Sequence, residues 1–201
     1  MSILRRLSGF SPFQDMTDVS EVYMSKTIHD RLVERLNWGL KNGLEDGGLI
    51  TVSKKPKVNV VDFYDAPDEF KSLEHFNTPK MLSSEWFERT KRNLISKGEK
   101  IGFEYHTHAI LVNHDIQVEH EEGKAEYRLN SYDEQNPLRN KLGDMIIEKE
   151  NNGQVYFFGF TPSERPHMIN LDGHSSVKRL HHLEIIVPDM NLKYQTSFDS
   201  V

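Results

Sequence analysis

Apolar residues recur every four positions in residues 19–44, with polar residues between them. This spacing predicts a long amphipathic helix, because residues four apart lie one turn above another on the same face. The apolar positions of that face are Ile28, Leu32, Leu36, Leu40 and Leu44. Asp18 or Ser20 can cap the start of this helix, and the glycines of Glu45–Gly48 can end it.

The next fifty residues predict two strands and two more helices. Alternating apolar and polar positions in residues 49–53 and 57–64 are typical of strands. Residues 66–76 predict a short helix with a proline near its first turn. Residues 78–98 predict a longer one that starts at a Thr-Pro pair and ends at a glycine.

From residue 100 onward, apolar and polar residues alternate with the period of two that strands show. The predicted strands are Ile101–Asn113, Ile116–His120, Ala125–Asn130, Asp144–Glu150, Gln154–Thr161 and Lys178–Val187. Short turns join several of them, and strands joined in this way must be antiparallel. Residues 130–143 and 161–176 are polar and predict long loops.

These elements predict an α+β fold in which N-terminal amphipathic helices precede an antiparallel β-sheet or small barrel. We expect an N-terminal arm over residues 1–17, then a helix-rich segment with a β-hairpin over 18–99. A β-rich segment over 100–188 and a polar C-terminal tail over 189–201 complete the chain. Residues 18–188 are expected to form one compact domain, since 201 residues suit a single core.

Composition excludes several classes of function. The chain has no cysteine, which excludes a disulfide framework, a thiolate metal site and a cysteine nucleophile. Its net charge of −6 disfavours nucleic-acid binding by neutralisation of phosphates. No apolar stretch approaches the roughly 20 residues that cross a bilayer. We therefore expect a soluble protein, in a virion or in host cytoplasm.

The most promising chemistry lies in the histidines of the first strand after residue 100. Side chains two residues apart in a strand point to the same face, so Glu104, His106 and His108 are expected to lie together. His182 and Glu184 share a face of the last predicted strand. If His182 reached the other two histidines, with a glutamate beside them, the set could bind Zn²⁺ or Fe²⁺. Apart from that case, no cofactor is expected.

No complete enzyme pattern accompanies these histidines. The glutamate that follows His-x-His in cupin-type sites is missing, because Leu111, Val112 and Asn113 occupy the positions where it would stand. The hydroxyl residues of two-histidine phosphoesterases and the serine and aspartate of JAMM-like metalloproteases are also missing. Paired histidines and carboxylates on a sheet face are commonly structural.

The sequence therefore favours a non-enzymatic structural or assembly protein, such as a connector, tail or other virion component of a tailed phage. The expected partners are further copies of the chain and neighbouring assembly proteins. The alternative is a histidine-dependent hydrolase, either a phosphodiesterase or a metal-dependent enzyme, that uses His106, His108, His182 and Glu184. A third hypothesis is a protein that sequesters a host factor through its acidic surface.

Overall fold

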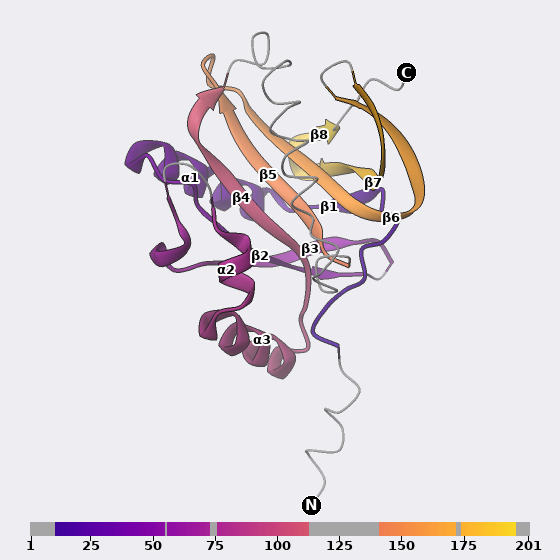
Figure 1. Ribbon diagram of the computed structural model, residues 1–201. Helices are drawn as coiled ribbons and strands as arrows, with labels where there is room; N and C mark the ends of the chain where they lie inside the picture. The colour runs from indigo at the N-terminus through magenta and orange to yellow at the C-terminus, as the bar shows by residue number, and fades with distance from the viewer. Residues whose placement is uncertain (1–10, 55, 73–75, 113–140, 172–173, 196–201) are drawn as a thin grey trace, which may run out of the picture.

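The structure is a computed structural model that combines a β-barrel with three α-helices (Figure 1). The residues it describes are 11–54, 56–72, 76–112, 141–171 and 174–195. Its strands are β1 (Glu21–Tyr23), β2 (Gly47–Ser53), β3 (Asn59–Asp65), β4 (Lys100–Val112), β5 (Gly143–Glu150), β6 (Val155–Leu171), β7 (His174–Val187) and β8 (Leu192–Gln195). Its α-helices are α1 (Lys26–Asn42), α2 (Thr78–Leu82) and α3 (Glu85–Lys97), and single 3-10 turns span Asp68–Phe70 and Pro188–Met190.

Seven of the described strands close into a barrel, in the order β1-β3-β2-β4-β5-β6-β7 and back to β1. The predicted α+β class and small barrel are thus confirmed. The sheet is mixed rather than wholly antiparallel: β1 is parallel to β3 and β7, and β4 is parallel to β5, whereas the other described pairs are antiparallel as predicted. Thirty residues, 113–142, connect β4 to β5, and parallel strands require such a long connection.

Alternate residues of the strands belong to two separate hydrophobic cores. Ile50 and Phe103 belong to a core that gathers side chains from β1 to β7 and from α1, and this core is the barrel interior. Leu49 belongs to a second core with α2 and α3, on the outer face of β2 and β4. The apolar face of α1 fills the barrel, since Leu32 and Leu36 are fully buried there. This confirms the predicted burial of these two side chains.

The predicted order, in which the helices precede the strands, is not observed, because β1, β2 and β3 are interspersed with the helices. The predicted helix over residues 19–44 begins only at Lys26, because the Ser25 hydroxyl accepts a hydrogen bond from the backbone N–H of Ile28 and caps the helix there. Residues 21–23, which precede the helix, form β1, and the side chain of Val22 in the middle of this strand is fully buried. Gly43, with φ 64°, ends the helix.

The helix predicted over residues 78–98 is two helices, α2 and α3. Ser84 separates them, since its hydroxyl accepts a 3.1 Å hydrogen bond from the backbone N–H of Phe87 and starts a new helix. Residues 66–76 contain only the 3-10 turn Asp68–Phe70 in place of the predicted short helix.

The loop predicted over residues 161–176 is largely β-structure, because β6 extends to Leu171 and β7 starts at His174. The pairing shifts register between Pro162 and His167, and such an irregularity accommodates prolines that donate no ladder hydrogen bond. Residues 192–195 of the predicted C-terminal tail form β8, which pairs with β7. Two predicted strands, Ile116–His120 and Ala125–Asn130, lie outside the described residues.

The described part of the predicted N-terminal arm packs on the barrel of its own chain. Met16 is fully buried, and Phe13 stacks on Phe87 with ring centroids 6.3 Å apart. The backbone of Ile101 exchanges hydrogen bonds with Pro12 and Gln14. Among the described residues no helix is long and apolar enough to cross a membrane.

Candidate functional site

Glu104, His106 and His108 lie on the outer face of β4, as their spacing predicts. Phe103 and Tyr105, which alternate with Glu104 and His106 along the strand, belong to the barrel core. The outer side chains are nevertheless well buried, since Glu104 is 4% exposed and His108 is 3% exposed. These side chains therefore point away from the barrel interior and are still shielded from water.

Each histidine of this patch faces a carboxylate from β5, which runs parallel to β4. The Nδ1 atom of His108 lies within hydrogen-bonding distance of the carboxylate of Glu148, whose side chain is 1% exposed. The Nδ1 atom of His106 lies 3.7 Å from the Oδ1 atom of Asp144. The two imidazole rings lie next to each other, with centroids 5.4 Å apart. We call these four residues together with Glu104 the histidine–carboxylate patch.

His182 does not join this patch. The register places Glu104 opposite Asp144, Asp144 opposite Phe160, and Phe160 opposite His182. Two strands, β5 and β6, therefore lie between β4 and β7. Neighbouring strands lie about 4.8 Å apart, so about 14 Å of sheet separates His182 from the row of Glu104.

Glu184, the last of the predicted site residues, has a different partner again. Its carboxylate forms a 2.7 Å ion pair with Lys193 of β8. In the part of the chain that the structure describes, no group of three or more His, Asp or Glu side chains is arranged to hold a metal ion.

A second polar cluster lies where α1, β2 and β3 meet the 3-10 turn Asp68–Phe70. Asp46 is fully buried and forms ion pairs with both Arg35 and Lys71, the second at 3.0 Å. Arg35 also pairs with Asp65 at 3.3 Å, and the Tyr105 hydroxyl donates a hydrogen bond to that carboxylate. We call these five residues the buried ionic network.

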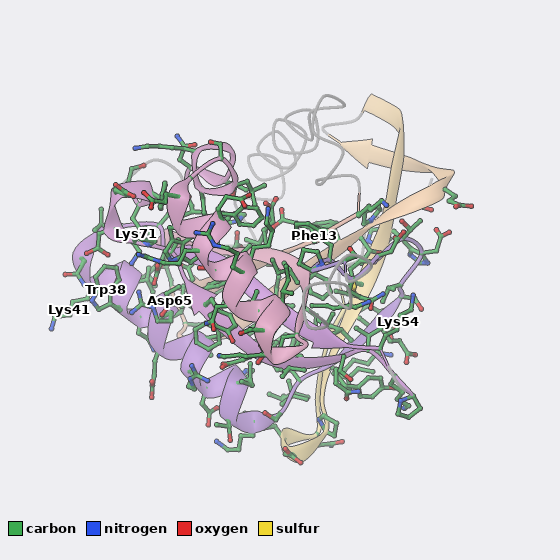
Figure 2. All side chains as sticks on the ribbon, turned by 90° about the horizontal axis from the view of Figure 1, so that it is seen from below. Phe13, Trp38, Lys41, Lys54, Asp65 and Lys71 are labelled. Atoms are coloured by element: carbon green, nitrogen blue, oxygen red, sulfur yellow. The ribbon has the colours of Figure 1, made fainter. Side chains whose placement is uncertain are left out.

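Trp38 contacts both cations of the buried ionic network. The Arg35 guanidinium lies 4.9 Å from its ring centroid and the Lys71 ammonium 4.7 Å, distances at which a cation is attracted to an aromatic face. Figure 2 shows Trp38, Asp65 and Lys71 close together near α1. The Lys71 side chain is 3% exposed, so these neighbours rather than water surround its ammonium group.

Burial decides the protonation of two groups in the network. Removal from water raises the pKa of Asp46, although Arg35 and Lys71 oppose this change. Burial also raises the pKa of Tyr105 well above its usual value, and the carboxylates of Asp65 and Asp46 add to the effect. The phenol therefore stays protonated and remains a hydrogen-bond donor.

No pattern of residues along the chain indicated the buried ionic network. Its members come from five different segments, and residues 45–48 read only as the end of a helix. Asp46 is in fact held to β4 by two hydrogen bonds, one from Thr107 N–H to its carbonyl at 2.7 Å and one from its own N–H to the Thr107 hydroxyl at 3.1 Å. The network joins α1 to the sheet, which is a structural role.

The outer half of the β6–β7 hairpin is the third candidate. Its pairs run from His167 opposite Lys178 to Leu171 opposite His174. We call residues 167–171 and 174–178 the β6–β7 arm. Figures 1 and 2 show this hairpin extending away from the rest of the barrel.

Within the described residues, the two strands of the arm pair only with each other. β5 pairs with residues 155–160 of β6, and β1 and β8 pair with β7 between residues 184 and 187. The outward-facing N–H and C=O groups of the arm therefore have no strand partner among the residues that the structure describes.

No protein-family model and no curated protein matches this chain. Among solved structures, the chain is similar to the solution structure of protein DSY2949 from Desulfitobacterium hafniense, with a TM-score of 0.47 and 15% sequence identity. The match covers 85% of this chain and 98% of the other. A likeness of this degree indicates neither family nor activity.

Proposed function

We propose that this chain is a non-enzymatic assembly protein that joins other subunits through the β6–β7 arm. The observation that carries the proposal is the length of the arm beyond the barrel, where its two strands pair only with each other among the described residues. A two-stranded hairpin alone is marginally stable in water. Its edges are also templates for a further strand.

Strand addition to such an edge is a common mode of protein recognition. In the proposed assembly, a neighbouring copy or another assembly protein contributes a strand to one edge of the arm. The setting we propose is a connector, tail or other virion component of a tailed phage, in the virion or in host cytoplasm. The described parts of the predicted N-terminal arm and C-terminal tail add no support, because residues 12–16 and 192–195 pack on the barrel of their own chain.

The histidine-dependent hydrolase has less support than assembly. That alternative requires His182 beside His106 and His108, and β5 and β6 lie between them. The strong burial of His108 also leaves little surface for a substrate.

An arm-shortened variant tests the proposal. Replacement of residues 164–179 by Asn-Gly would close the hairpin in a short turn, because Pro162 and Leu180 are already paired. Ser163 is kept, since its hydroxyl donates a 2.7 Å hydrogen bond to Asp18. A control variant receives the same Asn-Gly pair after Asn152, in the exposed turn between β5 and β6.

Analytical ultracentrifugation would compare the masses of the three proteins. We expect the wild type and the control to sediment as the same oligomer, with a mass that is a multiple of the 23.4 kDa chain. The arm-shortened variant should sediment as a folded monomer. Circular dichroism would establish that the variant is folded. A wild type that is monomeric at all concentrations and remains so with its neighbouring proteins, or a shortened variant that still assembles, would contradict the proposal.

A further inference from the structure

The two outer edges of the β6–β7 arm differ in how well they are protected against a further strand. β6 contains Pro162 and Pro166 next to the arm, and its pairing with β7 shifts register between residues 162 and 167. Prolines and bulges commonly protect an edge strand, since proline donates no hydrogen bond. β7 contains no proline from His174 to Val187. The outer edge of residues 174–178, which we call the β7 edge, is therefore better suited to accept a strand.

The register of the arm shows which backbone groups the β7 edge offers. Leu171 pairs with His174, so two residues close the hairpin, and the residues that flank such a turn exchange hydrogen bonds. Because this pattern alternates along an antiparallel pair, Ser176 directs its N–H and C=O toward β6. Ser175 and Val177 direct theirs away from β6. Two donors and two acceptors thus lie symmetrically about residue 176.

An edge of this kind is complementary to itself. A two-fold axis at Ser176 places residue 175 of each copy opposite residue 177 of the other, and each of these pairs exchanges two hydrogen bonds. The shared sheet then has four strands in the order β6-β7-β7-β6, two from each copy. Since a hairpin of two strands is marginally stable in water, the added strands stabilise both arms.

The length of the arm leaves room for a second copy. The barrel adjoins the arm after residue 178, and the connection between the two strands lies before residue 174 (Figure 1). In an antiparallel pairing the second barrel lies beyond that connection. Residues 174–178 span about 17 Å, at about 3.3 Å per residue. The two barrels therefore lie at opposite ends of the shared sheet.

We infer that the β7 edge binds the same edge of a second copy of the chain, by antiparallel pairing of residues 174–178 about a two-fold axis at Ser176. The missing protection favours a copy as the partner, because every molecule carries this edge and proteins normally block edges whose self-pairing is harmful. The inference rests on the proposed function and makes it more specific, since it names the edge of the arm and its partner.

Two matched proline variants test which edge is used. Val177→Pro removes an N–H group that points to the second copy, whereas Met168→Pro removes the outward N–H group of the residue opposite it, on β6. Neither change removes a hydrogen bond between β6 and β7. Val177→Pro costs each dimer two hydrogen bonds, so dimerisation measured by sedimentation equilibrium should weaken about 5–150-fold. Met168→Pro should dimerise as the wild type does, and circular dichroism would establish that both variants are folded.

A disulfide tests the partner and the register. The chain has no cysteine, so a single one can be introduced. The proposed axis brings the two Cα atoms of residue 176 about 4.5 Å apart, a distance that a disulfide spans. Ser176→Cys should therefore give a covalent dimer under mild oxidation. Ile169→Cys, at the position opposite on β6, is the control and should not, because three strand spacings of together about 14 Å separate its two copies.

The inference and the proposed function fail in different ways. If the arm-shortened variant is monomeric while Val177→Pro dimerises as the wild type does, the arm assembles the protein but the inferred edge is wrong. The inference alone also fails if Ser176→Cys forms no more covalent dimer than Ile169→Cys, or if the wild type associates only with its neighbouring proteins. A wild type that is monomeric alone and with those proteins, or an arm-shortened variant that still assembles, would overturn both.

Discussion

Replacement of Lys71 by Met tests whether the buried ionic network holds α1 to the sheet. Met has a similar length and no charge, so it fills the space of the lysine stem. The change leaves Asp46, which is fully buried, with Arg35 as its remaining ion-pair partner among the described residues. Removing one partner of a buried ion pair costs about 3–5 kcal/mol, because the other charge stays buried. Since Arg35 remains as a partner of Asp46, we expect the free energy of unfolding to fall by about 3 kcal/mol, the lower end of this range.

Two smaller contacts are lost as well and must be separated from this effect. The pair between Lys71 and Asp68 lies at the surface, since Asp68 is 81% exposed, and solvent screening leaves it little effect on stability. The contact with Trp38 contributes about 0.5–1 kcal/mol. In an Asp46→Asn background only these two contacts remain to be lost, so Lys71→Met should cost about 1 kcal/mol or less. The double-mutant cycle should therefore give a coupling of about 2 kcal/mol between Lys71 and Asp46.

Urea unfolding, followed by tryptophan fluorescence and by circular dichroism, would measure all four proteins. In thermal unfolding, 3 kcal/mol corresponds to a fall in Tm of about 6–12 °C for a chain of this size. Equal costs of Lys71→Met in the two backgrounds, or a coupling below about 0.5 kcal/mol, would refute the view that the two charges stabilise each other in the fold.

Two further predictions concern the same network. Burial raises the pKa of Asp46, so the folded protein holds that proton more tightly than the unfolded chain, and the resulting stability is lost as the pH rises through the folded-state pKa. The wild type should therefore lose stability relative to Asp46→Asn as the pH rises above about 4, in urea titrations at each pH, and a relative gain would contradict the direction of the shift. Tyr105→Phe removes the hydrogen bond to Asp65 and should cost about 1.5–3 kcal/mol of unfolding free energy, and an unchanged denaturation midpoint would show that this bond contributes nothing.

Hydrophobic periodicity predicted the local structure well where one face of an element is buried. The four-residue spacing of α1 identified Leu32 and Leu36 as core residues, and both are fully buried. The two-residue alternation of β4 placed His106 and His108 on one face, where their rings are in contact. These features depend on neighbours within one element, which the order of residues reveals.

Strand order and long-range pairing could not be predicted in this way. The proposed approach of His182 to His106 depended on which strands lie between β4 and β7, and nothing in either strand specifies β5 and β6. Short capping residues were the other source of error. Ser25 and Ser84 each begin a helix, yet both stand within longer stretches whose periodicity continues through them.

The buried ionic network shows why charged clusters are hard to infer from sequence. Lys71 and Asp46 are ordinary surface residue types, and most residues of these types are exposed. They are buried here because the 3-10 turn carries Lys71 back to the end of α1. Only the tertiary path of the chain reveals such a contact.

Hydrogen exchange of the backbone amides in the β6–β7 arm is the most direct test of the proposed assembly. In an antiparallel pair of strands, alternate residues direct their N–H groups away from the partner. If neighbouring subunits add strands to the arm, outward-facing amides of residues 167–171 or 174–178 should be protected at high protein concentration and should exchange quickly after dilution. Fast exchange of these outward-facing amides at every concentration, in the full chain and with its neighbouring proteins present, would contradict the account.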